Sequence, residues 1–106
     1  MQQEIDYNKL GLSIKKARRN KGLTQENLAE LAGCNPSHIS NIENNYTKVS
    51  LNTLLSIANA LDTSIDYLLQ EQYHNQSLAL DNEIAMAIAS CDIEMKERIL
   101  RIIKVL

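Results

Sequence analysis

Three polar side chains with hydrogen-bonding chemistry stand close together in this 106-residue chain: Ser37, His38 and Asn41. Their spacing places them on one face of a helix. A hydroxyl, an imidazole and an amide can each exchange hydrogen bonds with a ligand. Catalysis is not expected, because the sequence has no Gly-rich phosphate loop, no pair of His at metal-ligand spacing, and no Ser or Cys with a nearby base. We therefore expect a binding surface that uses no cofactor and no metal.

Positive charge is concentrated in the same half of the chain. Residues 1–48 contain seven Lys or Arg against five Asp or Glu, whereas residues 49–106 contain four against eight, so the halves carry +2 and -4. A basic first half on an acidic protein suggests a local surface that attracts a polyanion. The alternative is that "KKARRNK" is only the solvated face of a helix. The cations expected to add salt-dependent affinity are Lys15, Lys16, Arg19, Lys21 and Lys48.

The composition indicates an all-helical protein with one domain and a small appendage. Phe and Trp are absent, and one Pro and three Gly leave little material for turns. Cys34 and Cys91 lie far apart in sequence, so we expect reduced thiols, with Cys34 as a small buried side chain. The polar N-terminus and the lack of an apolar run of about 18 residues predict a cytoplasmic protein that does not enter a membrane.

Two short helices must position the polar side chains. Thr24 is a good N-cap for a helix that reaches Ala32, and Gly33 ends it. Asn27 stands where a capping box would have Glu or Gln, so we expect an incomplete box. Asn35 caps the next helix, over residues 36–43, with Pro36 at its first position.

Three further helices are expected around this pair. They cover Leu12–Lys21 (ending at Gly22), the segment from Ser50 to Leu61, and a short one from Thr63 or Ser64 to Leu69. The side chains expected inside are Leu12, Ile14, Ala17, Leu23, Leu28, Ala29, either Leu31 or Ala32, Ile39, Ile42, Leu51, Leu54, Leu55, Ala58, Leu61, Ile65, Leu68 and Leu69.

Two short helices joined by a turn that contains Gly match the helix-turn-helix motif, whose second helix lies in the major groove of DNA. Ala29 is small where the two helices must cross closely. Gly33 supplies a positive φ in the turn, and Ile39 inserts between the helices and sets their angle. The alternative is a helical bundle that keeps only the shape of the motif.

The stretch Ile14–Leu69 resembles the phage repressor and Cro-like regulators, the xenobiotic-response-element family of helix-turn-helix proteins. The segments "GLTQENLAELAG", "ISNIE", "LLSIANALD" and "DYLL" occur in the order and spacing of that family. This resemblance implies a five-helix bundle that binds operator DNA as a dimer.

The resemblance also implies roles for single residues. Gln25 would contact a phosphate and brace the second helix, and Arg18 would pair with Glu43. The residues implied to face the bases are Ser37, His38 and Asn41. For Asn41, bidentate binding of adenine competes with a phosphate or water contact, and His38 could instead face solvent.

The start of the second helix and the loop after it complete the predicted DNA-binding set. Asn35 and Pro36 belong to it, although Pro36 replaces a side chain that reads a base in some relatives. Asn45 stands where Gly is frequent and can take the left-handed conformation. The loop residues implied to contact the DNA backbone are Asn44, Tyr46, Thr47 and Lys48.

The C-terminal part has its own pattern. We expect the DNA-binding domain over residues 8–70, a linker over 71–80, and two amphipathic helices over 81–106, capped by Asp81 and Asp92. Their apolar stripes exceed what two short helices can bury between themselves, so they either pack back on the bundle or, as we expect, meet a second subunit. The predicted dimerisation residues are Ile84, Ile88, Ile99, Ile102, Ile103 and Leu106.

The sequence thus predicts a transcriptional regulator that is not an enzyme. It would be a repressor that binds a palindromic operator in double-stranded DNA as a homodimer. The alternative is an antitoxin or antirepressor-controlled regulator whose tail binds a protein antagonist or toxin.

Overall fold

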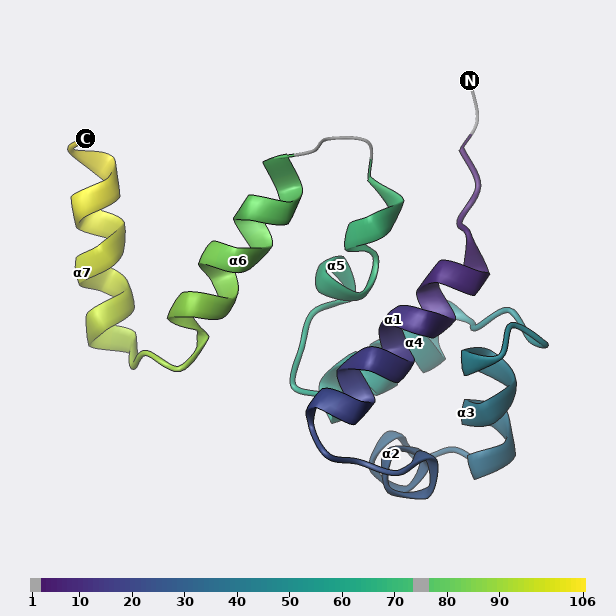
Figure 1. Ribbon diagram of the computed structural model, residues 1–106. Helices are drawn as coiled ribbons and strands as arrows, with labels where there is room; N and C mark the ends of the chain where they lie inside the picture. The colour runs from purple at the N-terminus through teal and green to yellow at the C-terminus, as the bar shows by residue number, and fades with distance from the viewer. Residues whose placement is uncertain (1–2, 74–76) are drawn as a thin grey trace. The chain divides into compact units, whose positions relative to one another are not determined.

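The computed structural model describes residues 3–73 and 77–106 and divides into two units, residues 1–74 and 75–106 (Figure 1). All regular secondary structure in these residues is helical, as the composition predicted. The first unit contains α1 (Tyr7–Asn20), α2 (Gln25–Ala32), α3 (Pro36–Glu43), α4 (Leu51–Ala60), α5 (Ile65–Leu68) and the short 3₁₀ helix η1 (Gln70–Gln72). The second contains α6 (Ser77–Ala89) and α7 (Ile93–Lys104).

Helix α1 begins before the predicted start. Asp6 caps it, because its carboxylate accepts a hydrogen bond from the Lys9 backbone N–H at 3.1 Å. The prediction of a start at Leu12 was wrong, since it missed this cap and treated Gly11 as lying outside the helix. Leu12 itself is exposed. The chain leaves the helical path just after α1, at Gly22, which has a φ of 73°.

The start of α2 corrects a second prediction. The Thr24 hydroxyl accepts from the Asn27 N–H at 3.0 Å, and the Asn27 side-chain oxygen accepts from the Thr24 N–H at 3.1 Å. The capping box is therefore complete, although it was expected to be incomplete. The Asn amide supplies the same acceptor oxygen as Glu or Gln on a shorter side chain.

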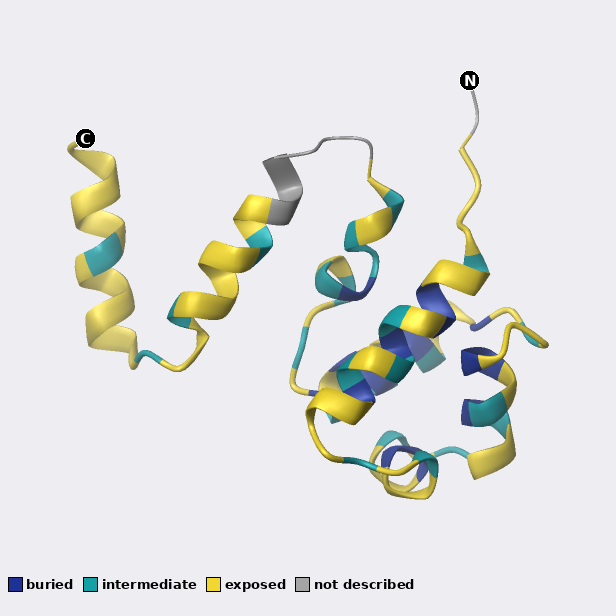
Figure 2. Cartoon of the chain, in the orientation of Figure 1, coloured by how far each residue is buried: buried dark blue, intermediate teal, exposed yellow. Residues whose placement is uncertain are grey.

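The core lies where α1, α2, α3 and α4 meet (Figure 2). Helix α3 packs on α1 and α2, α2 also packs on α4, and α5 contacts α1 and α4. The buried face of α4 contains Leu54, Ile57 and Ala58, and the following residue Leu61 is buried as well. The fully enclosed large side chains are Leu10, Ile14, Leu28, Ile39, Ile57 and Leu68.

Three leucines that were expected inside lie on the surface: Leu12, Leu51 and Leu55. Leu51 is 72% exposed and Leu55 50%. In α4 the buried stripe runs through Leu54, Ile57, Ala58 and Leu61, whose spacing of three and four residues excludes its neighbours. In α2 the half-buried Ala32 faces the core instead of Leu31.

The two ends of the first unit are joined by paired hydrogen bonds. The Gln72 side chain accepts from the Asp6 backbone N–H and donates to the Asp6 carbonyl, both at 2.9 Å. One amide side chain thus pairs with both backbone groups of a single residue.

The boundary between the two units lies inside the predicted linker over residues 71–80, but the linker was predicted too long, because η1 covers Gln70–Gln72 and Ser77 already begins α6. Asp81 therefore lies inside α6 and is not the cap that was predicted. Residues 74–76 of the predicted linker lie outside the described part. The predicted cap of α7 is confirmed, because the Asp92 carboxylate accepts from the Met95 N–H at 2.8 Å.

Helix α7 has two chemically distinct faces. Its polar face contains an ion pair between Arg98 and Glu94 at 3.2 Å. Its apolar stripe is largely uncovered, since Ile102 is 59% exposed, Ile103 52% and Leu106, just after the helix, 96%. In the described ranges, no helix combines the length and the apolar character needed to cross a membrane.

Candidate nucleic-acid interface

The angle between α2 and α3 is set by three buried or constrained residues. Ala29 is 1% exposed and Ile39 0%, so small and large side chains fill the crossing of the two helices. Gly33 has a φ of 72°, which reverses the chain direction after α2. The Cys34 N–H then donates to the Ala29 carbonyl at 2.9 Å and closes the turn. Helix α3 is thereby held in one orientation.

Helix α3 presents opposite faces to the core and to solvent. Ile39 and Ile42 are buried, whereas Ser37 and Asn41 are exposed and His38 is half-buried. Within the described residues, the Asn41 amide makes no side-chain hydrogen bond, so its donor and acceptor are both available. The structure therefore places the three predicted reading residues around the solvent side of α3.

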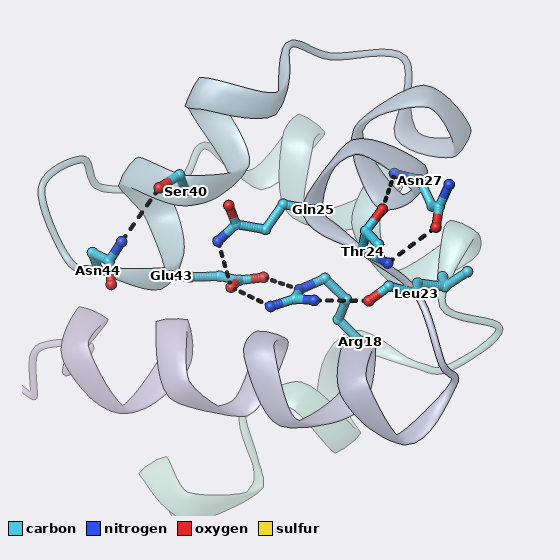
Figure 3. A network of polar contacts seen from close by, with 8 residues as sticks. All are labelled: Arg18, Leu23, Thr24, Gln25, Asn27, Ser40, Glu43 and Asn44. Carbon is cyan, nitrogen blue, oxygen red and sulfur yellow. Dashed lines mark hydrogen bonds and ion pairs between the residues drawn. The ribbon is translucent and has the colours of Figure 1, made fainter.

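A buried polar network ties α3 to the first two helices (Figure 3). Arg18 Nε donates to Glu43 Oε2 at 2.7 Å, and Arg18 Nη2 donates to Glu43 Oε1 at 3.1 Å. Arg18 Nη1 also donates to the Leu23 carbonyl at 2.7 Å. The ion pair implied by the resemblance is present, and its bidentate geometry fixes α1 to the last residue of α3.

Gln25 joins the same network from the start of α2. Its Nε2 donates to Glu43 Oε1 at 3.1 Å, and the side chain is half-buried. This bond agrees with the expectation that Gln25 braces α3, the second helix of the motif. The Gln25 amide has a second N–H, so one side chain can hold Glu43 and still donate to a phosphate.

The loop after α3 is folded onto the backbone of Asn41. Asn45 has a φ of 61°, the left-handed conformation that was predicted for it. The N–H groups of Tyr46 and Thr47 donate to the Asn41 carbonyl at 2.8 and 3.3 Å. Tyr46 is left 80% exposed. The loop is thus held against the C-terminal end of α3.

Asn44 and Lys48, two of the loop residues predicted to contact the DNA backbone, each make a side-chain contact within the domain. Asn44 Nδ2 donates to Ser40 Oγ at 3.3 Å. The Lys48 ammonium lies 5.5 Å from the centre of the Tyr7 ring, within the range of a cation–π contact. Tyr7 was not singled out from the sequence, because the predicted first helix began after it.

Gly11 is a second residue that sequence reasoning missed. A Cβ at this position would lie 2.5 Å from the Ile42 carbonyl oxygen and 3.0 Å from that of Glu43. Only Gly lets α1 approach the end of α3 this closely. An isolated Gly inside a helical pattern was the available signal, since such a residue often has a packing reason.

Cys34 is the titratable side chain of the turn between α2 and α3. Burial raises the pKa of the Cys34 thiol above its ordinary value, so the thiol stays protonated near neutral pH. The side chain is half-buried in the turn, less enclosed than predicted. Over the described ranges, no group of three His, Cys, Asp or Glu side chains is arranged to hold a metal ion.

A buried ion pair, a turn with a positive φ and an exposed polar helix define a helix-turn-helix DNA-binding domain. Residues 14–68 match the helix-turn-helix family, about half of the chain. The chain belongs to this family of transcriptional regulators.

Three known proteins illustrate the relationship. The chain is 30% identical over 94 residues to the uncharacterized HTH-type transcriptional regulator YqaE of Bacillus subtilis, an alignment that covers 84% of this chain and 81% of the relative. It is 37% identical to the restriction-modification controller protein C.AhdI of Aeromonas hydrophila, with a TM-score of 0.59 over 61% of this chain and 98% of the other. The structure of the biofilm regulator SinR in complex with DNA gives 39% identity and a TM-score of 0.54, covering 57% of this chain and 97% of the other.

Proposed function

We propose that this regulator is a cytoplasmic repressor that binds a palindromic operator as a homodimer and acts by occupying DNA, without catalysis. The observation that carries the proposal is the two-sided character of α3. Its inner side is held by Ile39, Ile42 and the Arg18–Glu43 pair, while its outer side exposes polar side chains, among them an Asn41 amide with no side-chain hydrogen bond in the described residues. A rigid helix with unpaired donors and acceptors suits the edges of bases in the major groove.

The proposed division of labour follows from the position of each side chain. Ser37, His38 and Asn41 read base edges. Asn35 and Pro36 lie at the start of α3 and belong to the same DNA-binding set, but they are not proposed to read a base. Gln25 supports base reading by holding Glu43 with one N–H and leaving another for a phosphate. The residues proposed to hold the DNA backbone in the loop are Asn44, Tyr46, Thr47 and Lys48, of which all but the half-buried Thr47 are exposed.

Dimerisation is proposed to use the second unit. One helix-turn-helix domain offers few base contacts, so tight specific binding calls for two domains on two half-sites. The apolar stripe of α7 is exposed and lies opposite its ion-paired polar face, the arrangement expected of a helix that packs against a partner. The side chains proposed at this contact are Ile84, Ile88, Ile99, Ile102, Ile103 and Leu106.

A second candidate function rests on the same stripe. An apolar surface of this kind could instead accept a protein antagonist or toxin, as in an antitoxin or an antirepressor-controlled regulator. Deleting residues 78–106 separates the two candidates. Loss of self-association together with weaker DNA binding supports the homodimer, whereas an unchanged oligomeric state supports a docking site for another protein.

The proposed DNA contact is tested by mobility shift on the DNA that flanks the gene of this protein. We expect a saturable specific complex whose affinity falls steeply as salt increases, because cationic side chains replace counterions on the phosphates. Asn41→Ala should lose about 1 to 3 kcal/mol of discrimination at one base pair in each half-site.

The matched control is Asn52→Ala, which removes another exposed Asn outside the proposed interface. We expect it to leave the base preference and the affinity unchanged. A base preference that survives in Asn41→Ala would refute the assigned role of Asn41. A complex that does not distinguish the flanking DNA from unrelated DNA would refute sequence-specific binding.

A further inference from the structure

The side chain of Asn35 restricts how the Ser37 hydroxyl can form hydrogen bonds. The Asn35 side-chain oxygen lies 3.0 Å from the Ser37 backbone nitrogen and 2.6 Å from Ser37 Oγ. The backbone N–H can only donate, so the group that faces it must be the amide oxygen and not the amide nitrogen. This contact fixes the orientation of the Asn35 amide.

The direction of the second bond follows from the first. An amide oxygen carries no hydrogen, and two oxygens 2.6 Å apart need one between them. The hydrogen must therefore come from the Ser37 hydroxyl. Since a Ser hydroxyl has a single hydrogen, Ser37 Oγ offers only lone pairs to anything that approaches from outside.

A hydroxyl oxygen that can only accept a hydrogen bond distinguishes the two bases of a base pair. In the major groove every pair presents one amino group, on adenine N6 or cytosine N4, and one keto oxygen, on thymine O4 or guanine O6. A free Ser hydroxyl could bind either group by rotating. One whose hydrogen is already used can bind only the amino group.

We propose that Asn35 restricts Ser37 Oγ to accepting a hydrogen bond from a base. Ser37 then selects an adenine or cytosine and rejects a thymine or guanine at one position of each half-site. This rests on the proposed function, in which Ser37 faces the bases. Ser37 is exposed on the solvent side of α3, so its free lone pairs are accessible. In this arrangement Asn35 acts as a positioning residue, because it sets specificity through the hydrogen bond it accepts and not through a base contact.

The experiment is a selection of bound DNA from random duplexes, carried out in parallel with the full-length wild-type chain, Ser37→Ala, Asn35→Gly and Asn35→Asp. Gly is tolerated at an N-cap at a cost of only a few tenths of a kcal/mol. Asn35→Gly therefore releases the Ser37 hydroxyl while keeping the fold, which a thermal melt of each variant verifies. Asn35→Asp is the matched control, since a carboxylate still accepts the hydrogen.

For the wild-type chain we expect one position of the half-site to favour adenine or cytosine over guanine or thymine. This preference disappears in Ser37→Ala. In Asn35→Gly the same position accepts all four bases, because the released hydroxyl can donate to a keto oxygen. In Asn35→Asp the preference persists, although the added negative charge lowers the overall affinity for DNA.

A direct measurement then deletes only the amino group from the preferred base of the selected duplex. Wild-type binding should weaken by about 2- to 10-fold, the value of one neutral hydrogen bond. Binding by Ser37→Ala should not change between the two duplexes. Comparing the two proteins on the two duplexes isolates the hydrogen bond between Ser37 and the amino group from any other effect of the substitution or of the altered base.

The outcomes separate this proposal from the function on which it rests. If the wild-type chain enriches no motif, sequence-specific binding is refuted, and this proposal with it. A palindromic motif that Ser37→Ala leaves unchanged retains the function but refutes base reading by Ser37. A preference for guanine or thymine at the Ser37-dependent position, or identical selections from Asn35→Gly and Asn35→Asp, refutes the control by Asn35.

Discussion

The Glu43 carboxylate shows how a single residue can hold the interface in place. Its side chain is fully enclosed, and its oxygens accept hydrogen bonds from Arg18 and Gln25. A carboxylate in such a position needs these partners, because burial without them would leave a charge that water no longer stabilises. The recognition helix is thus fastened at its last residue by groups from two other helices.

We expect Arg18→Met to lower the free energy of unfolding by about 3 to 5 kcal/mol, because it leaves Glu43 buried without its cation. Urea denaturation measures this. The double variant Arg18→Met with Glu43→Leu should lose less than Arg18→Met alone, since it removes the buried charge as well. A double variant that is less stable than the single one would contradict this explanation.

Gly11 provides a second test at the scale of one residue. Gly11→Ala places a methyl group against the backbone of Ile42 and Glu43, which cannot rotate away. We expect a loss of about 1 to 3 kcal/mol of stability from this overpacking. Ala is otherwise the better helix former, so Asn8→Ala, at an exposed position of α1, should be neutral or stabilising in the same denaturation assay.

At the scale of elements, the N-caps from α2 to α5 were predicted well, whereas the cap of α1 was missed and the buried faces were predicted less well. Thr24, Asn35, Ser50 and Ser64 all act as N-caps, because their signal is local and depends only on the side chain and the next few residues. The buried face of α4 depends on which neighbours it meets. Leu51 and Leu55 have the same character as Leu54, and only the packing decides that they lie outside.

The proposed DNA-binding surface shows the same contrast between features set by local sequence and features set by distant contacts. The proposed reading residues followed from position in the motif. Tyr7 and Gly11 were missed because they act through distant contacts, Tyr7 with Lys48 and Gly11 with Ile42, which are separated by 41 and 31 positions in the sequence. Such contacts leave no periodic trace in the sequence. The direction of the Ser37 hydrogen bond is likewise a matter of geometry, which requires the two distances to Asn35.

The turn between α2 and α3 allows a test of backbone conformation alone. At Gly33 a Cβ would meet no atom within 4 Å, so any cost of a substitution comes from its φ of 72°. We expect Gly33→Ala to lose about 1 to 2 kcal/mol. Gly33→Asn should lose less, since Asn tolerates the left-handed region, and equal losses in thermal denaturation would point to a packing effect instead.

At the scale of the whole molecule, the second unit has little to bury its apolar side chains against within itself. We expect Ile102→Glu to weaken self-association at least about tenfold, the equivalent of losing one buried Ile side chain. Sedimentation analysis measures this. Leu100→Glu is the control, because Leu100 has a similar exposure, 50%, and lies off the apolar stripe.

The control separates a specific contact from a general effect of added charge. Leu100→Glu should retain the association constant of the wild type. Equal weakening by both substitutions would argue against the α7 stripe as the contact. A wild-type chain that remains monomeric throughout the measured concentrations would argue against the homodimer itself.

The paired hydrogen bonds between Gln72 and Asp6 have a consequence for how the first unit can be built. Its two ends are neighbours, so the order in which the helices follow one another along the chain is not needed to hold them together. A circular permutant whose original ends are joined by a short Gly-rich linker and whose new ends are opened at Asp62, between α4 and α5, should therefore fold to the same bundle. Its circular dichroism spectrum should match that of the unpermuted first unit.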